Sequence, residues 1–431
     1  TAAIVEAMKR AKVAPAEVDE VIMGQILTAG AGQNPARQAA IGAGIPVDKT
    51  AYQINQLCGS GLRSVALGYQ AIRTGDCAIV VAGGQESMSQ APHCIHLRNG
   101  VKMGDTQMID TMIKDGLWDA FNGYHMGVTA ENVAQKWQIT REQQDQFAAL
   151  SQQKAEKAQK AGHFKAEIVP VTIKDRKGDK VIDTDEHPKH GTTVEALAKL
   201  RPAFAKDGTV TAGNASGIND AAAALVLISR EKMEELGVKP QARVVDFAAV
   251  GCDPEIMGVG PIYAVEKVLK KAGMTLDDID VMELNEAFAS QAYYCIQQIG
   301  YPPEKVVRKT YANFGNISRA WKRSELPLVA KGWGLDYPAL RAVKPDVIML
   351  SSCLMGQTGP LASFAGYGNL AAAISGFTLS RFSRGGAISS EGTVGSVPGA
   401  ATGRGLAAGS EGAVVAGTGS GVGAPPTARS G

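Results

Sequence analysis

The sequence has almost no excess of charge of either sign, and it has no long apolar run. Its 431 residues carry 44 Lys and Arg against 42 Asp and Glu, so the formal net charge is +2. This balance predicts no nucleic-acid partner. No stretch approaches the roughly twenty apolar residues of a membrane-spanning helix, and the N-terminus has no signal-peptide core. We therefore expect a cytoplasmic protein with no membrane partner.

The cysteines and histidines are few and scattered. Cysteine occurs at positions 58, 77, 94, 252, 295 and 353, and no pair has the CxxC spacing of a zinc ribbon. Neither a disulfide framework nor a zinc site is suggested, and a reducing compartment fits this usage. All six histidines precede residue 191, so the rest of the chain has no imidazole for catalysis.

One cysteine, Cys58, stands where a strand-like stretch gives way to a helical pattern. Residues 51–57 read as a strand, and an apolar helical face follows, formed by Leu62, Val65, Ala66 and Tyr69. Cys58 should then lie in the first turn of the helix, where N–H groups and the helix dipole stabilise a thiolate. Gly59 and Gly61 would let a substrate carbonyl approach the N–H of Cys58. An inert buried cysteine is the alternative, and position alone weighs the two readings about equally.

The chain contains an internal repeat. An apolar helical face ending at Ala11 recurs at Ala272, 261 positions later, and in both places acidic residues and a strand follow. The repeat predicts two α/β halves of similar topology packed back to back, with the active site where they meet. Because the first copy begins directly in a helix, we expect a further strand to precede it.

The pattern changes between residues 91 and 213, which predicts an inserted loop domain that covers the site. Thr140 and Gln143 form a capping box at the start of a long helix. Stretches 168–173 and 180–182 flank a turn and predict a hairpin. The lysines here alternate with aspartates, so we expect most of them to form a solvated face.

Six stretches, in the right order, resemble the thiolase family and particularly its short-chain acetyl-CoA acetyltransferase branch. They are residues 55–61, 82–93, 124–127, 199–204, 213–220 and 285–289, and they lie within residues 1 to about 301. The resemblance implies an α/β fold of two duplicated βαβαβαββ halves, layered α/β/α/β/α, with an inserted loop domain. It also implies coenzyme A thioesters as substrates, no metal or other cofactor, and a homodimer or homotetramer.

The same resemblance implies roles for individual residues. Cys58 would carry the acyl group, and Asn285 would hold a water that stabilises the enolate of a second acetyl-CoA, giving acetoacetyl-CoA and CoA reversibly. The residues that would line the CoA channel are Leu117, His125, Met126, Lys189, Ala215, Ser216, Met257, Ala287 and Phe288. Lys189 stands where the family often has arginine, and lysine lacks the planar fork that suits phosphate. Without the resemblance, His125 and the apolar members read as ordinary structural positions.

Two stretches that a thiolase should carry are missing after residue 301. One is GGAxxxGHPxGxxG, with the histidine that activates the nucleophile, and the other is CxGGG, with a cysteine acid/base. Cys353 lies in a different context. Residues 306–377 instead resemble an internal piece of a class III CoA-transferase without its catalytic aspartate. Residues 378–431, rich in Gly, Ala, Ser and Thr, predict a disordered tail.

The expected domains are therefore a first thiolase half at 1–230, a partial second half at 237–301, the CoA-transferase-like piece and the tail. Each positioned acid or base contributes about a hundred- to ten-thousand-fold, so losing two should leave little turnover. The leading hypothesis is an impaired acetyl-CoA acetyltransferase, and the alternative is a non-catalytic CoA-binding remnant or chimera. A ketoacyl synthase is disfavoured by the residues around Cys58 and Asn285. A CoA-transferase would need an aspartyl-CoA intermediate.

Overall fold

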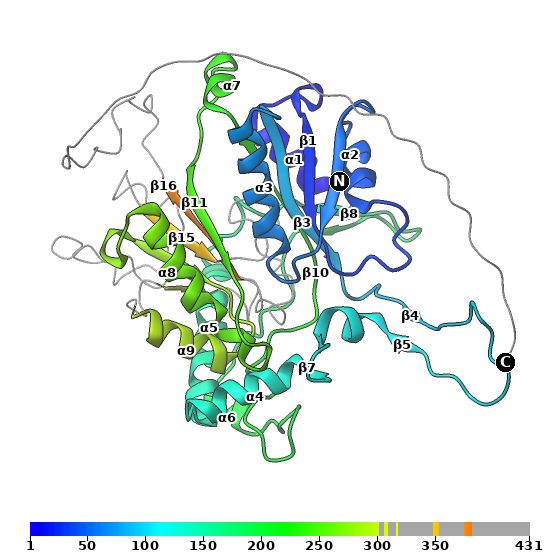
Figure 1. The fold of residues 1–431 in the computed structure, drawn as a ribbon, viewed down its shortest axis with the longest axis vertical. Helices are drawn as coiled ribbons and strands as arrows, with labels where there is room; N and C mark the ends of the chain where they lie inside the picture. Colours follow the sequence, from blue (N-terminus) through cyan, green and yellow to red (C-terminus); the bar gives the residue numbers. More distant parts are fainter. Residues whose placement is uncertain (301–305, 309–315, 318–347, 353–374, 382–431) are drawn as a thin grey trace, which may run out of the picture. The chain divides into compact units, whose positions relative to one another are not determined.

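A computed structural model describes residues 1–300, 306–308, 316–317, 348–352 and 375–381. Its first sheet consists of β1 (Glu20–Gly24), β2 (Thr50–Ile54), β3 (Ile79–Ser87) and β10 (Asp220–Ile228), in the order β10–β3–β1–β2. Strands β1, β3 and β10 are labelled in Figure 1. Strands β1, β2 and β3 are parallel, and β10 is antiparallel to β3. The parallel strands are joined through helices α2 (Pro35–Gly42) and α3 (Ser60–Thr74).

Alternation along the strands distributes side chains to the two faces of this sheet. Ile79 and Val81 pack in one core with helix α1 (Ala2–Ala11) and helix α2. The opposite face carries Val80, which lies so close to α3 that a Cβ on Gly68 would stand 3.0 Å from its Cγ1. Helices therefore cover both faces of the first sheet.

The second sheet has the order β11–β16–β15–β12–β13–β14 in the described residues. Its strands are β11 (Arg243–Val250), β12 (Val281–Leu284), β13 (Val306–Arg308), β14 (Asn316–Ile317), β15 (Ile348–Ser352) and β16 (Ser375–Arg381). Strand β12 is parallel to β13 and β15, whereas β16 is antiparallel to its neighbours β15 and β11. Helix α8 (Gly260–Ala272) packs on β11 and β16, and helix α9 (Ala289–Ile299) packs on α8.

The expected duplication is confirmed element by element. The 3₁₀ turns η1 (Pro15–Glu17) and η4 (Leu276–Asp278) lie 261 positions apart, as do the ends of α1 and α8. Both helices end in a left-handed residue, Lys12 at φ 56° and Gly273 at φ 64°. The order β10–β3–β1–β2 corresponds to β16–β15–β12–β13 in the second sheet. The strand expected before α1 stays a prediction.

Helix α3 contacts both sheets. It packs on β1, β3 and β10 of the first sheet and on β16 of the second. From the same helix, the Tyr69 ring meets the Phe247 ring of β11 edge to face, with centroids 6.1 Å apart. The two halves are thus joined through α3, which agrees with the expected α/β/α/β/α layering.

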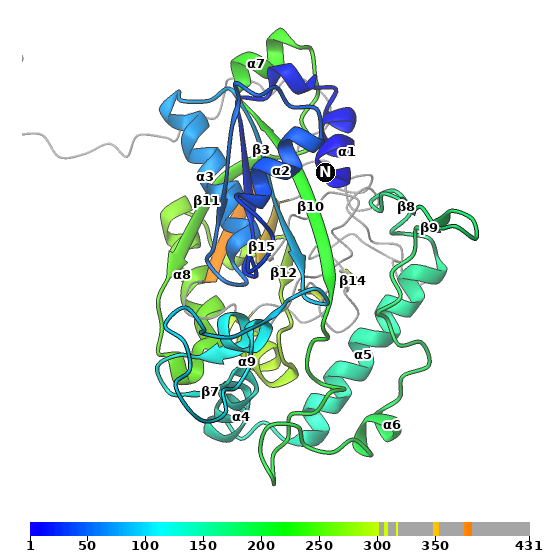
Figure 2. The same ribbon diagram turned by 90° about the vertical axis from the view of Figure 1, so that its right-hand side faces the viewer.

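The inserted region supplies three helices, α4 (Met126–Lys136), α5 (Arg141–Lys160) and α6 (Val194–Ala198). Helices α4 and α5 both pack on α9 (Figure 2), and Phe147, Ala148 and Ala149 of α5 join the core of the second half. The capping box is confirmed, since the Thr140 N–H donates to the Gln143 side chain at 2.8 Å. The apolar side of α5 therefore anchors the insertion to the second half.

Short strand pairs complete this region. The expected hairpin is confirmed as β8 (Val171–Ile173) paired with β9 (Lys180–Ile182). Two further pairs are β4 (His93–Cys94) with β5 (Ile109–Asp110) and β6 (Trp118–Asp119) with β7 (Tyr124–His125). Between β5 and β6 runs a single π-helical turn, η2 (Met112–Leu117).

Two details qualify the expectations for the remaining segments. Residues 378–381, expected to open a disordered tail, belong to β16, where backbone hydrogen bonds to β11 and β15 order them. Cys353 and the rest of the expected tail lie outside the described residues. None of the described helices has the length and apolar character needed to span a bilayer.

Candidate active site

Cys58 lies in the connection between β2 and α3. The preceding residue, Leu57, has a left-handed backbone conformation with φ 50°, which is uncommon for residues other than Gly, Asn and Asp. Two side chains hold this turn: Asn55 Oδ1 accepts from the Leu57 N–H at 2.9 Å, and Ser60 Oγ accepts from the Gln56 N–H at 2.8 Å. The turn therefore presents Cys58 in one defined orientation.

The exact start of the helix differs from expectation. The N-cap residue is Gly59, so Cys58 lies just before the first turn and not within it. The N-terminus of α3 also approaches the end of β1 very closely: a Cβ on Gly24 would stand 2.4 Å from the Ser60 carbonyl carbon. Only glycine fits at position 24, because the two nearest atoms, the Ser60 carbonyl carbon and the Gly61 nitrogen, belong to the backbone. Cys58 itself is 2% exposed and forms no disulfide.

The structure gathers Cys58 and most of the expected channel residues into one apolar cluster, here termed the Cys58 cluster. Its buried members are Leu27, Cys58, Met88, Leu117, Met126, Ala130, Val210, Ala223, Met257, Ala287 and Phe288. Six of these were expected from the sequence, and Ala215, also expected, packs against them. The members come from the first half, the insertion and the second half, as predicted for a site where the halves meet.

His125 borders this cluster through an aromatic contact. Its ring stacks on Phe204 with centroids 4.7 Å apart, and Phe204 in turn meets Phe288 edge to face at 6.2 Å. His125 is the N-cap of α4, where its Nδ1 accepts from the Gly127 N–H at 3.0 Å. Burial lowers the pKa of His125, which favours the neutral imidazole.

Ser216 and Ala215 meet the segment that follows Asn285. The Ser216 N–H and hydroxyl both donate to the Ala287 carbonyl oxygen, at 3.1 and 3.0 Å, and Ala215 forms an antiparallel bridge with Phe288. Asn285, 9% exposed, directly follows β12. Expected residues of the two halves are thus placed side by side.

Lys189, also expected at the site, is not a member of the Cys58 cluster. The residue is exposed. Its backbone N–H donates to Gln152 Oε1 at 2.9 Å, and its carbonyl oxygen accepts from the Thr192 hydroxyl at 2.6 Å. An exposed ammonium suits a charged, solvated portion of a ligand and not the apolar cluster.

Two neighbours of the site carried no assigned role in the sequence analysis. Phe204 was noted only as part of a motif. Glu86 accepts from the Ile26 and Leu27 N–H groups at 2.8 and 3.0 Å, and burial raises its pKa to about 7. Hydrophobic periodicity could not predict a role for Phe204 or Glu86, because the residues that each of them contacts are distant in the chain.

No group of three or more His, Cys, Asp or Glu side chains in the described ranges is arranged to hold a metal ion. The site consists of a thiol, apolar walls, an imidazole and an amide. Such a set can transfer an acyl group through a covalent thioester.

Comparison with known proteins identifies the class. The thiolase N-terminal domain matches residues 1–231, and the thiolase C-terminal domain matches residues 238–312. The chain belongs to the thiolase family. Its α/β fold agrees: the crystal structure of the Bacillus anthracis acetyl-CoA acetyltransferase has a TM-score of 0.74 at 36% identity, covering 88% of this chain and 91% of that one. Human mitochondrial 3-ketoacyl-CoA thiolase has a TM-score of 0.75 at 35% identity, covering 89% and 92%.

Two relatives with higher sequence identity are both named acetyl-CoA acetyltransferase. The acetyl-CoA acetyltransferase of Rhizobium meliloti (strain 1021) is 62% identical over 305 residues, which are 71% of this chain and 78% of the relative. That of Shinella zoogloeoides is 60% identical over 299 residues, 69% of this chain and 76% of the relative. CoA-transferase family III matches residues 322–422, which confirms the second resemblance, although the match begins after the expected residue 306 and ends beyond the expected residue 377. The thiolase match extends to residue 312, beyond the expected residue 301.

Proposed function

We propose that this chain is a thiolase-type acyltransferase that takes acetyl groups from acetyl-CoA through Cys58. The observation that carries the proposal is the burial of Cys58, on a strained turn, within a cluster that contains Leu117, Met126 and Phe288. Relatives named acetyl-CoA acetyltransferase at about 60% identity support acetyl-CoA as the substrate.

In the first half-reaction Cys58 acts as the nucleophile without the activating histidine that other thiolases carry. The Cys58 sulfur attacks the carbonyl carbon of acetyl-CoA, a new C–S bond forms, and CoA leaves with the proton that Cys58 gave up. We assign the backbone N–H of Cys58 to the oxyanion site, where it would donate a hydrogen bond to the negatively charged oxygen of the tetrahedral intermediate. The apolar cluster excludes water, which would otherwise hydrolyse the acyl-enzyme.

In the second half-reaction another acetyl-CoA loses a methyl proton, and its carbanion attacks the acyl-enzyme to give acetoacetyl-CoA. We assign Asn285 to the enolate site, with Ala287 and Phe288 beside it. The thiolase histidine and cysteine motifs are absent from this sequence. We infer that turnover is strongly impaired, because each positioned acid or base typically contributes about a hundred- to ten-thousand-fold.

The channel assigned to CoA runs past His125, Met126, Leu117, Met257, Ala215 and Ser216, and Lys189 would meet the charged nucleotide end. We infer that the protein acts in the cytoplasm, as a homodimer or homotetramer, without a metal or prosthetic group. The compartment is supported by a 54% identical relative from rat that is named as cytosolic.

The test is the intact mass of the protein after incubation with acetyl-CoA. An acetyl adduct that disappears in Cys58→Ala and persists in Cys94→Ala supports the proposal. Cys94 is a suitable control because it is a half-buried thiol in the β4–β5 pair, outside the Cys58 cluster.

The main alternative, a non-catalytic CoA-binding remnant, predicts a different result. In that case CoA binds by calorimetry but no adduct forms at any cysteine. An acetyl adduct that persists in Cys58→Ala would contradict the assignment of Cys58 as the nucleophile.

A further inference from the structure

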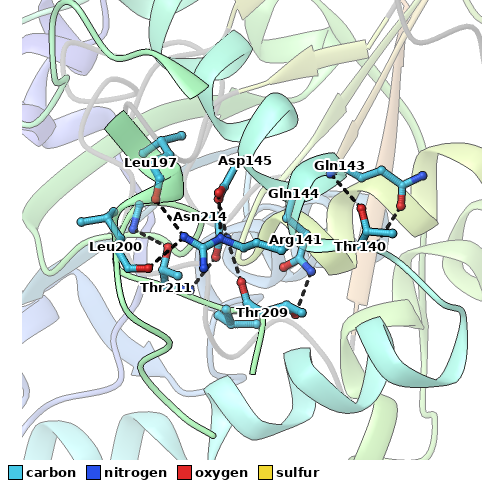
Figure 3. A network of polar contacts seen from close by, with 12 residues as sticks. Thr140, Arg141, Gln143, Gln144, Asp145, Leu197, Leu200, Thr209, Thr211 and Asn214 are labelled. Carbon is cyan, nitrogen blue, oxygen red and sulfur yellow. Dashed lines mark hydrogen bonds and ion pairs between the residues drawn. The ribbon is translucent and has the colours of Figure 1, made fainter. Parts of the chain in front are cut away.

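A buried polar network joins helix α5 of the insertion to the loop that precedes Ser216 (Figure 3). The Asp145 carboxylate accepts from Arg141 Nε at 2.7 Å through Oδ2 and from Asn214 Nδ2 at 2.9 Å through Oδ1. Asp145 is 1% exposed and Asn214 is fully buried. Asp145 faces the Arg141 guanidinium as an ion pair, and hydrogen bonds between such groups are of the stronger, charge-assisted kind.

Asn214 transmits this anchor to the loop. Its Oδ1 accepts from the Thr211 N–H at 2.7 Å, and its Nδ2 also donates to the Thr209 carbonyl oxygen at 3.0 Å. One amide side chain therefore ties the loop both to itself and to helix α5 (Figure 3). Its orientation follows from these partners, since Oδ1 can only accept and Nδ2 can only donate.

The backbone of the same residues holds the segment after Asn285. The Asn214 carbonyl oxygen accepts from the Ala289 N–H at 3.0 Å, and the Ser216 N–H donates to the Ala287 carbonyl oxygen at 3.1 Å. These two hydrogen bonds fix the segment that contains Phe288, a buried member of the Cys58 cluster.

From these contacts we propose that Asp145 and Asn214 are positioning residues for the acyl-CoA channel. They set the register of residues 214–216 against 287–289, and so the width of the channel beside Cys58. The proposal rests on the assigned CoA channel. Asn214 directly precedes the assigned channel residues Ala215 and Ser216, whereas Asp145 lies on helix α5 and acts on them through Asn214.

The experiment combines two measurements on the full chain, with the variants Asp145→Asn and Asn214→Ser. In Asp145→Asn an NH₂ group must face a donor, either Arg141 or Asn214, whereas serine at 214 is too short to reach Asp145. We expect faster hydrogen exchange at the Ser216 and Ala289 amides. We also expect CoA to bind about tenfold more weakly by calorimetry, as for loss of a hydrogen bond to a buried charge.

The double variant should weaken CoA binding by less than the sum of the two single variants, because the hydrogen bond between Asn214 and Asp145 is already lost in each of them. Lys160→Gln is the matched control on the same helix, since Lys160 forms only an exposed ion pair with Glu156, and it should change neither quantity. Unchanged exchange at both amides overturns the inference, as does faster exchange with undiminished CoA affinity. If the unmutated chain binds no CoA, the proposed function itself fails, whatever the exchange pattern shows.

Discussion

The Ser151 hydroxyl, on helix α5, donates a 2.8 Å hydrogen bond to the carboxylate of Glu286, the residue after Asn285. Both side chains are buried, at 1% and 0% exposure. A helix of the insertion therefore contacts the Asn285 segment of the second half directly, in addition to its contact through Asn214.

Ser151→Ala should lower the free energy of unfolding by about 1–3 kcal/mol, because a buried carboxylate loses one of its donors. Urea denaturation at neutral pH measures the change. Lys160→Ala, which removes an exposed ion pair on the same helix, should leave the midpoint almost unchanged. Equal midpoints for Ser151→Ala and the unmutated chain would contradict the importance of this contact.

Gly24→Ala should disturb Cys58 without touching it. The new methyl group would overlap the backbone at Ser60 and Gly61, so the start of α3 must shift. We expect a loss of about 1–3 kcal/mol of stability, as for overpacking in a core. The rate at which iodoacetamide alkylates Cys58 should change as well.

Gly75→Ala provides the control for that change. Gly75 ends α3 with φ 82°, and a Cβ there would meet open space, so only backbone strain of about 1–2 kcal/mol is added. Its Cys58 alkylation rate should equal that of the unmutated protein. The same alkylation change in both variants would mean that general destabilisation, and not the approach at Gly24, controls Cys58.

Phe204→Leu should raise the pKa of His125 toward its ordinary value. Burial is the cause of the lowered pKa, and the stacked Phe204 ring covers the imidazole. Histidine titration by NMR measures the shift, with His125→Asn used to assign the resonance. A His125 pKa that does not move in Phe204→Leu would show that other groups bury the imidazole.

Glu86→Gln should change the pH dependence of stability. Burial raises the pKa of Glu86 from 4.5 to about 7, so between these values the folded protein holds a proton that the unfolded chain releases. The contribution of Glu86 to the free energy of unfolding is therefore present below pH 4.5 and is lost as the pH rises through about 7.

Denaturant titrations at pH 5 and pH 7.5 measure this effect, and Glu86→Gln should reduce the loss of stability between the two. Burial also raises the pKa of Asp185 to about 7, so Asp185→Asn should likewise reduce the loss of stability between pH 5 and pH 7.5. An unaltered pH dependence in Glu86→Gln would show that Glu86 is ionised in the folded protein throughout this range.

Much of the local structure could be predicted because its causes are local. The Thr140–Gln143 capping box and the helical faces ending at Ala11 and Ala272 depend on residues within a few turns. The repeat could be detected for the same reason, because each copy is a local pattern. The two 3₁₀ turns begin and end 261 positions apart, as the repeat predicts. Cys58 was expected within the first turn of α3 but precedes it, because N-cap geometry depends on the backbone of Leu57 and Gly59, whose φ values the hydrophobic pattern does not encode.

Short motifs in the right order predicted the thiolase fold of the first 300 residues, and the resemblance assigned Cys58 as the candidate nucleophile together with its apolar partners. Three contacts could not be predicted from such motifs: Phe204 covers His125, Glu86 anchors residues 26 and 27, and Asp145 reaches Asn214. These contacts join segments far apart in the chain. Periodicity and motifs act over short spans, whereas such pairs form only when the sheets and the insertion pack together.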